Sequence, residues 1–571
     1  MTAATAALGR LASPVSRRSW FVLLAVATAA LYLAFNGQWT LPHDNNAPTF
    51  DLINDFRAWI DANRNANLIL VLVVGGIRGL LDATYDGFAL VLESLSWAGL
   101  TVIGGALGFL IGGWRMGLLA ASGLLSFGVL GYWESSVETL ALTLAAVAFS
   151  LLIGLPLGII AGRNQRFYDA IRPVLDTMQI MPTFAYLAPV SLFFLIGPAT
   201  AAIVTLIYAV PPAIRITALG IRGVAPATVE AAASLGATRG QVLAKVQLPM
   251  ARRTIVLGIN QTIMMALSMV VITALVDAPG LGKDIISAVK ISNVGRAVDA
   301  GLAIVIMAIL LDRLTTRASE RLDPAKTGSN PPIDRRVYLG AAAASVAAVV
   351  VGTVALGGNE FPEAVAFTFE RPVNDVVAWI AATFFDATEW LKNTITYGLI
   401  NPLEAVLTKA PWWLVAGTLT ALALLVAGRR TAVITAVCLL AIVGIEMWEH
   451  SMQTLTQVLV ATALTLVLGL VLGIASARSD RFSMILRPIL DAAQTLPAFV
   501  YLVPALALFG PTRFTGGIVA AVIYAVPPVI RLVEIGIRTV PASVREAGVS
   551  VGSTPGQLLR KVELPIARPA I

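Results

Sequence analysis

The sequence predicts an all-α integral membrane protein, a polytopic bundle of helices built from two related copies. Of its 571 residues, 57% are hydrophobic and only 13% are charged, whereas soluble globular domains carry about 25% charged residues. Apolar runs of about twenty residues recur along the chain, and each is long enough for a helix to cross a bilayer. The alternation typical of membrane β-strands is absent, so helices are the expected spanning structure.

A polar, basic segment occurs twice in this apolar chain. Glu230–Ile255 and Glu546–Ile571 are identical at fifteen of 26 aligned positions. The similarity extends upstream, where Leu486–Pro504 repeats Ile171–Pro189 and the sequence IYAVPP precedes each loop. A hydrophilic loop repeated between hydrophobic spans indicates a duplicated membrane unit with two docking points for the same soluble partner.

These matches divide the chain into five predicted segments: N-terminal membrane helices at 1–132, copy one at 133–313, a polar linker at 314–336, further membrane helices at 337–447, and copy two at 448–571. The linker is rich in proline and arginine. Copy two stops at its repeated loop, without counterparts of the apolar runs at 255–276 and 297–313. We therefore expect copy two to be truncated, and the native polypeptide to continue for about two more spanning helices.

Hydropathy places the membrane spans and charge orients them. Spans are expected at about 19–36, 96–113, 116–132, 138–161, 181–196, 199–220, 255–276 and 297–313, and then at 337–356, 412–427, 431–447, 453–476, 497–510 and 514–535. The basic loops Arg163–Arg172, Glu230–Arg253 and Arg313–Arg336 share one side, which the positive-inside rule makes cytoplasmic. If Asn67–Leu81 also crossed the membrane, the basic loops would no longer all lie on one side. We therefore expect this run to be interfacial or re-entrant.

The repeated loop has the features of a compact helical projection. Glu230, Ala231 and Ala232 are expected to open a helix, with an acid near its positive end. Gly236 is expected to end that helix with a sharp turn. A second short helix is expected from Gln241 to Leu248, before Pro249. The alternative is an ordinary loop of helix-forming residues that is alike in both copies through descent alone.

Proline pairs and amides within the spans mark a candidate translocation path. A proline pair is expected to interrupt one long apolar span in each copy, and interrupted helices at equivalent positions of two halves are typical of a transport path. A simple packing kink is the alternative. Two neighbouring amides add polar groups at a span edge. The candidate path residues are Pro211, Pro212, Asn260, Gln261, Pro527 and Pro528.

Charged residues beside the proline pairs have simpler expected roles. Arg215 and Arg531 follow the pairs by one turn, and we expect both to extend toward the membrane interface. Glu534 has no acidic counterpart in copy one, where Ala218 stands. Its helical spacing suits an ion pair with Arg531.

The composition excludes several kinds of site. The chain has one cysteine and two histidines, which excludes an intramolecular disulfide and makes a metal site unexpected. GLGKD at Gly280–Asp284 lacks the leading glycine and the Ser/Thr of a P-loop, so no ATP site is expected in this chain. The net charge of +7 lies in short loops beside apolar runs, where it orients the protein rather than binding nucleic acid.

The loop resembles a known signature, E-A-A, three residues, G, nine residues, then I-x-L-P, found in membrane permeases of ATP-binding-cassette (ABC) importers. The matching residues are Glu230, Ala231, Ala232, Gly236, Leu248 and Pro249 in copy one, and Glu546, Ala547, Gly552, Leu564 and Pro565 in copy two. Valine replaces isoleucine in both copies, and glycine stands at the third position of copy two. Longer blocks, such as IRPVLDTMQIMPTFAYLAP and YAVPPAIR, resemble the glycine betaine/proline permeases. The resemblance covers about 133–313 and 448–571, and this chain departs from the family in carrying two copies.

The resemblance implies tandem transmembrane domains of a type I ABC importer in the plasma (inner) membrane. It implies that the two loops are cytoplasmic coupling helices that dock on ABC ATPase subunits at two sites. ATP and Mg²⁺ would bind those subunits, with no cofactor and no catalytic residue in this chain. It also implies an extracytoplasmic solute-binding protein, contact with membrane lipid, and import of glycine betaine, proline or a related compatible solute.

Other functions are weighed against this one. The same importer class can carry choline, carnitine or sulfonates. An ion-coupled secondary transporter with two repeated halves would need acidic residues within its spans, which are almost free of them. A membrane enzyme would need a His, Cys or acid cluster that the chain lacks.

Overall fold

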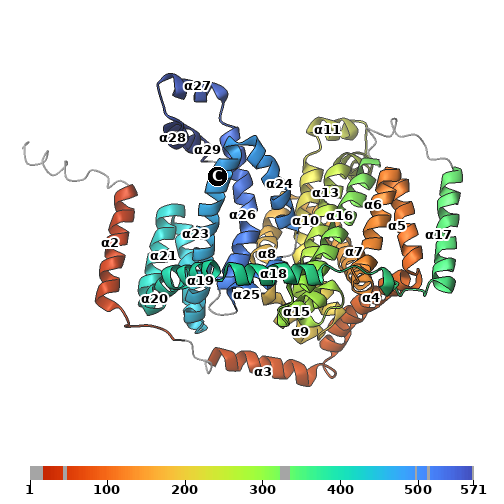
Figure 1. Ribbon diagram of the computed structural model, residues 1–571, viewed down its shortest axis with the longest axis horizontal. Helices are drawn as coiled ribbons and strands as arrows, with labels where there is room; N and C mark the ends of the chain where they lie inside the picture. The colour runs from red at the N-terminus through yellow and green to blue at the C-terminus, as the bar shows by residue number, and fades with distance from the viewer. Residues whose placement is uncertain (1–16, 43–47, 322–334, 496–497, 511–514, 569–571) are drawn as a thin grey trace, which may run out of the picture. The chain divides into compact units, whose positions relative to one another are not determined.

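The computed structural model describes residues 17–42, 48–321, 335–495, 498–510 and 515–568. These residues form helices joined by turns and short connections, and the described segments contain no strand (Figure 1). Within them, seven helices are long and apolar enough to cross a membrane, or up to ten if each sharply bent helix pair counts as one span. The predicted class, an all-α membrane protein, is confirmed.

Copy one begins with the long helix α7 (Trp133–Arg163). The elements after it are α8 (Gln165–Ile180), α9 (Phe184–Phe194), α10 (Pro198–Arg222), α11 (Pro226–Ser234), α12 (Arg239–Val242), the π-turn η2 (Leu243–Gln247), α13 (Leu248–Ser268), α14 (Val270–Thr273), the 3₁₀ turn η3 (Ala274–Val276), α15 (Leu281–Lys290) and α16 (Val294–Arg321). A bend of 102° separates α8 from α9. Pro182 lies in this break, because the residue before a proline disfavours helix.

Copy two repeats this order of helices. Its first helix, α23 (Trp448–Arg478), has 31 residues, as α7 does. The elements after it are α24 (Asp480–Thr495), α25 (Ala498–Phe509), α26 (Thr515–Arg538), α27 (Ala542–Ser550), α28 (Pro555–Leu558), the π-turn η7 (Leu559–Glu563) and α29 (Leu564–Ala567). From the first long helix to the repeated loop, the internal duplication therefore extends from the sequence to the order and length of the helices.

Further helices precede each copy. Before copy one these are α2 (Arg17–Phe35), α3 (Pro48–Asn63), η1 (Leu70–Val74), α4 (Gly75–Ser94), α5 (Trp97–Gly112) and α6 (Trp114–Val129). Before copy two these are α17 (Arg335–Ala355), η4 (Glu363–Val365), α18 (Glu370–Thr383), α19 (Phe385–Ile395), η5 (Thr396–Ile400), α20 (Asn401–Lys409), α21 (Trp412–Ala427) and α22 (Arg429–Gly444). In sequence, each group thus ends in a pair of short apolar helices joined by a glycine.

Helices that precede one copy in the sequence pack against helices that precede the other copy. α17, which precedes copy two, packs against α5 before copy one, and α2 packs against α21 (Figure 1). The contacts define two compact units. One unit holds the described parts of Met1–Trp59, Phe384–Arg487 and Leu508–Ile571. The other unit holds the described parts of Ile60–Thr383 and Pro488–Ala507. The segments 1–132 and 337–447 are therefore each divided between the two units.

Several amphipathic helices were not expected from hydropathy. α8 and α24 follow the first long helix of each copy, and α18 to α20 lie between α17 and α21. Their polar faces lower the mean hydropathy, so a search for apolar runs passes over them. The run Asn67–Leu81 leads into α4, which continues to Ser94 and is bent by 98° from α5.

The proline pairs do not interrupt their helices, contrary to the sequence prediction. α10 is helical from Pro198 to Arg222 and α26 from Thr515 to Arg538, straight through both pairs. Each proline removes one main-chain donor, but the close packing of neighbouring helices keeps the adjacent turns helical. In copy one the pair is buried in the helix that packs against α7 and α13.

Candidate functional site

The repeated loop of copy one is a pair of short helices joined by a glycine turn. α11 ends at Ser234, and Gly236 has φ +82°, the left-handed conformation that closes many helices. A capping box then starts α12: the Thr238 hydroxyl accepts the Gln241 main-chain N–H at 3.3 Å, and the Gln241 side chain accepts the Thr238 N–H at 2.8 Å. The predicted glycine turn is confirmed.

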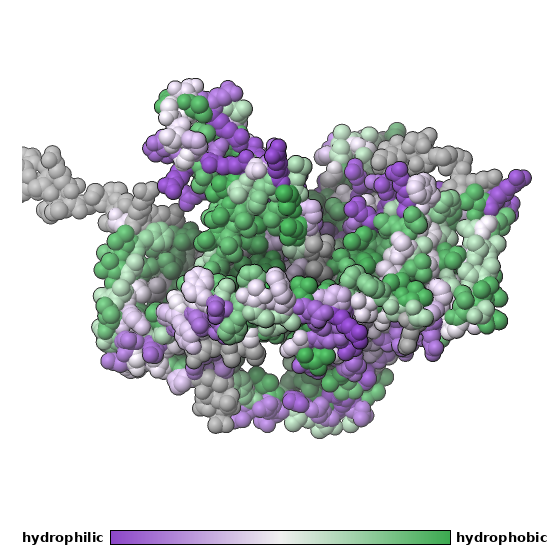
Figure 2. Space-filling view, in the orientation of Figure 1, coloured by the Kyte–Doolittle hydropathy of each residue, from purple (hydrophilic) through white to green (hydrophobic). Residues whose placement is uncertain are grey.

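Copy two builds the same loop. α27 ends at Ser550, and Gly552 has φ +77°. Thr554 and Gln557 form the matching capping box at 3.3 and 2.9 Å. The sequence analysis missed this box, although Thr-x-x-Gln at the same place in both copies is a recognisable signal. Figure 2 shows hydrophilic side chains gathered over α27 and α28, next to the largely hydrophobic surface of α23 and α26.

The helix boundaries within the loop differ from the prediction in two ways. α11 begins at Pro226, so Glu230 lies in its second turn and does not open it. Proline at the first helical position has its φ already set for a helix, which explains the earlier start. The second helix also does not stop before Pro249: it continues through η2 into α13, with the Leu248 N–H donating to the Leu243 carbonyl. This wider π-turn accommodates the proline without ending the helix.

The signature residues divide between an outer and an inner face. Glu230, Ala231 and Gly236 are exposed, whereas Ala232 is half-buried. Leu248 points inward and packs against the apolar cluster formed by the ends of α10 and α13. In copy two the exposed group is Glu546, Ala547 and Gly552, and Leu564 packs inward; Pro249 and Pro565 remain exposed. The first half of the signature thus faces outward, while its leucine fixes the loop to the membrane helices.

Each loop carries one strongly exposed hydrophobic side chain directly before its glycine turn. The exposed fraction is 89% for Leu235 and 82% for Val551. A side chain this exposed makes few contacts within its own chain, so it is accessible to another molecule at this position. The family signature specifies no residue type at these two positions, and sequence reasoning did not select them.

The two loops are fixed to their membrane helices by different chemistry. In copy two, Glu563 is buried and pairs with Arg545 at 3.3 Å and Arg478 at 4.0 Å. Valine and glutamine occupy the positions in copy one that match Arg545 and Glu563, and an apolar cluster replaces the ion pairs. The outward geometry is therefore the same although the inward contacts are not.

The amides of the candidate path lie at a helix–helix contact. Asn260 is buried well inside α13, rather than near the helix start, because the helix begins at Leu248, before the predicted span. Its side chain donates to Asp312 of α16 at 2.6 Å and accepts from Thr315 at 3.0 Å. Gln261 is half-buried. That these residues and the proline pairs border a solute path remains a prediction.

The charged residues beside the prolines form ion pairs. Arg215 pairs with Asp176 of α8 at 2.5 Å. That this side chain extends toward the membrane interface remains a prediction. Glu534 pairs with Arg538 at 3.0 Å and Arg487 at 3.4 Å, rather than with Arg531. Asp176 and Arg487 come from α8 and α24, the amphipathic helices that hydropathy does not reveal, whereas Arg538 lies on α26 with Glu534.

Residues 154–328 and 466–571 match the family described as binding-protein-dependent transport system inner membrane component. Over 543 residues the chain is 33% identical to the trimethylamine N-oxide transport system permease protein TmoV of Ruegeria pomeroyi, across 91% of this chain and 81% of that protein. The chain belongs to this family of importer permeases. The two matched segments cover most of copies one and two, and the first extends into the linker; the match confirms a tandem of permease domains.

Other relatives match about half of this permease. The glycine betaine transport system permease protein OpuAB of Bacillus subtilis is 42% identical over 268 residues, 47% of this chain and 93% of its own. The glycine betaine/proline betaine transport system permease protein ProW of Escherichia coli is 42% identical over 243 residues, 43% of this chain and 69% of its own. A relative matched over nearly its whole length thus accounts for one half of the permease.

Membership of the family decides the general role. The permease is a multi-pass protein of the plasma membrane and a transport subunit, not itself an enzyme. Family membership implies an ABC ATPase and a solute-binding protein as its partners.

Proposed function

We propose that this permease forms the membrane pathway of an ATP-driven importer in which each repeated loop docks one ATPase subunit. The observation that carries the proposal is the loop itself, built twice with the same glycine turn, the same capping box and an exposed apolar residue at the same position. A rigid projection of this kind can transmit a movement of its partner to the helices behind it. ATP and Mg²⁺ would bind on the partner, and lipid would surround the membrane helices.

The proposed solute is glycine betaine or a related small compatible solute. Glycine betaine, or a related compatible solute such as proline, is the first candidate, because the permeases matched at 42% identity are named for glycine betaine. Trimethylamine N-oxide is the second candidate, because the permease named for it matches 91% of this chain. Choline, carnitine and sulfonates are the remaining alternatives.

Uptake into proteoliposomes tests both the energy source and the solute. The permease, its ATPase and its binding protein are reconstituted with ATP inside the vesicles, and uptake of labelled glycine betaine, trimethylamine N-oxide, choline, carnitine and a sulfonate is compared. We expect ATP-dependent uptake of glycine betaine or trimethylamine N-oxide. Uptake that follows an ion gradient without ATP would instead support a secondary transporter.

Reversing the charge of both exposed glutamates is expected to uncouple the complex. Glu230 and Glu546 occupy matching exposed positions, and each is proposed to make a charge-assisted contact with the ATPase. Removing one partner of a buried contact of this kind costs about 2–5 kcal/mol. The double variant Glu230→Lys, Glu546→Lys should insert normally but lose most solute-stimulated ATP hydrolysis. Stimulation at the wild-type level would refute the role of these carboxylates.

Cysteine labelling tests the proposed orientation. In a Cys438→Ser background, single cysteines are placed at Gly240 in the loop and at Asp55 in α3. An impermeant maleimide added to intact cells should label position 55 and leave position 240 unlabelled until the cells are opened, because the basic loops are expected to face the cytoplasm. Strong labelling at position 240 from outside would reverse the assignment.

A further inference from the structure

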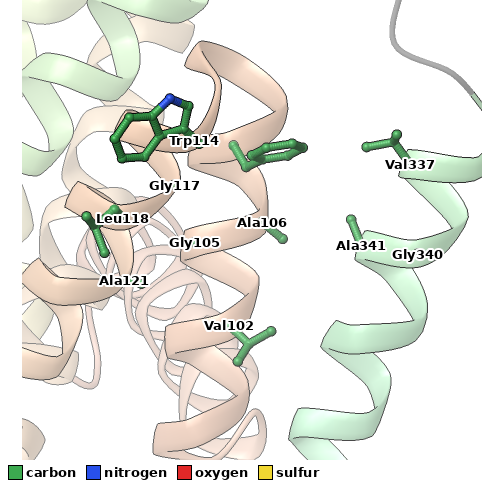
Figure 3. A pocket seen from close by; sticks show the side chains of 11 residues that line it. Val102, Gly105, Ala106, Trp114, Gly117, Leu118, Ala121, Val337, Gly340 and Ala341 are labelled. Atoms are coloured by element: carbon green, nitrogen blue, oxygen red, sulfur yellow. The ribbon is translucent and has the colours of Figure 1, made fainter.

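A groove lies between the helix pair α5–α6 and the peripheral helix α17. Its volume is about 740 Å³, within the range of about 300–1,000 Å³ typical of ligand sites. Figure 3 shows Val102 and Ala106 of α5 facing Ala341 and Val337 of α17 across an open space. The lining side chains are apolar or small, so a hydrocarbon would fit this surface and a polar solute would not.

The groove narrows toward one end. There Gly99 and Gly352 allow α5 and α17 to touch: a Cβ on Gly99 would lie 2.6 Å from a Val349 methyl, and one on Gly352 would lie 2.1 Å from the Ser96 hydroxyl. Toward the other end the helices separate. A third helix, about 10 Å across, could not follow the groove into its narrow end. A single extended hydrocarbon chain could.

Small residues on both walls keep the wide part open. Gly340 of α17 has no atom within 4 Å of the position where a Cβ would stand. Ala106 and Ala341 face the same space across the gap. Small-residue faces normally bring membrane helices into contact. Here the faces stay apart, so an additional molecule has to supply the missing packing.

The wide end of the groove carries positive charge. The guanidinium carbon of Arg115 lies 5.5 Å from the ring centroid of Trp114, a lining residue. Arg335 and Arg336 begin α17 directly before the lining residue Val337. Arg317 of α16 also reaches this end, since a Cβ on Gly112 would lie 3.5 Å from its Cγ. Glu320 pairs with Arg317 at 2.8 Å and offsets one of these charges.

We propose that this groove binds an anionic phospholipid, with an acyl chain along α5 and α17 and the phosphate at the arginines. Basic pockets at the end of an intramembrane groove are suited to anionic lipid headgroups. The bound lipid completes the contact between α17 and the α5–α6 pair. The proposal is independent of the transported solute.

Native mass spectrometry of the detergent-solubilised permease tests this site with phosphatidylglycerol and phosphatidylcholine added separately at equal concentration. We expect one retained phosphatidylglycerol and at least tenfold less retained phosphatidylcholine. Gly340→Leu fills the groove and should lower retention at least fivefold. Gly417→Leu is the matched control: it introduces the same side chain in α21, where a Cβ would also meet no atom within 4 Å, and should retain lipid as the wild type does.

Further variants test the contact with the lipid headgroup separately from the contact with the acyl chain. Arg115→Gln combined with Arg335→Gln should remove the preference for phosphatidylglycerol, while Arg166→Gln, an exposed arginine of α8, should leave it intact. Equal retention of the two lipids by the wild type would overturn the proposal. Equal lipid retention by Gly340→Leu and Gly417→Leu would also overturn it.

Discussion

Replacing Leu235 and Val551 together with glutamate is expected to abolish solute-stimulated ATP hydrolysis while the permease still folds and inserts. Both side chains are largely exposed, so their replacement removes almost no packing within the chain. At a docking surface, loss of an apolar anchor costs about 2 kcal/mol or more, which is about thirtyfold in affinity. A carboxylate placed against an apolar pocket adds a further penalty.

Conservative and single variants control this experiment. Leu235→Met with Val551→Met retains an apolar side chain at each loop and is expected to keep most of the stimulation. Each glutamate variant alone leaves one loop intact, so comparison of the two single variants measures whether the copies contribute equally. Full stimulation in the double glutamate variant would show that these residues do not contact the ATPase.

Gly158→Leu is expected to prevent stable folding of copy one. Gly154, Gly158 and Gly162 lie four residues apart on α7 and face α10. A Cβ on Gly158 would lie 2.7 Å from the Thr217 Cβ, closer than two such atoms approach, and a tight 3.0 Å from the Ile214 carbonyl oxygen. Overpacking by even small groups costs about 1–3 kcal/mol, and a leucine must separate the two backbones.

The yield and melting temperature of the purified protein measure this effect. Gly473→Leu is expected to do the same in copy two, because a Cβ there would lie 2.6 Å from the Val533 Cβ. Gly417→Leu places a leucine in a helix where no atom lies near, and it should melt as the wild type does. A Gly158→Leu protein with wild-type yield and melting temperature would show that α7 and α10 do not pack as described.

Hydropathy and internal repetition predict most of the membrane helices, because burial in lipid leaves a long apolar run in the sequence. They do not reveal α8 and α24, whose apolar and polar faces average out. Those helices supply Asp176 and Arg487, the partners of Arg215 and Glu534. Sequence reasoning therefore missed the partners of both charges, and its pairing of Glu534 with Arg531 was wrong.

The turn of each repeated loop was predictable, and the exposed apolar residue before it was not. Gly236 and Gly552 indicate a left-handed turn in the sequence, because glycine adopts that conformation without strain. Leucine and valine occur throughout this chain, so only the structure separates Leu235 and Val551 from buried residues of the same type. The proline pairs show the opposite case: a strong local signal for a helix break is overridden by packing in α10 and α26.

The stoichiometry of the assembled complex tests the central claim most directly. Gly240→Cys and Gly556→Cys are introduced together in a Cys438→Ser background, a short bifunctional crosslinker is added to the complex with the ATPase, and the mass of the product is measured. Two coupling loops in one chain predict one permease crosslinked to two ATPase subunits, and to one when either cysteine is omitted. A product that never contains more than one ATPase subunit per permease would contradict the claim that both loops dock the ATPase.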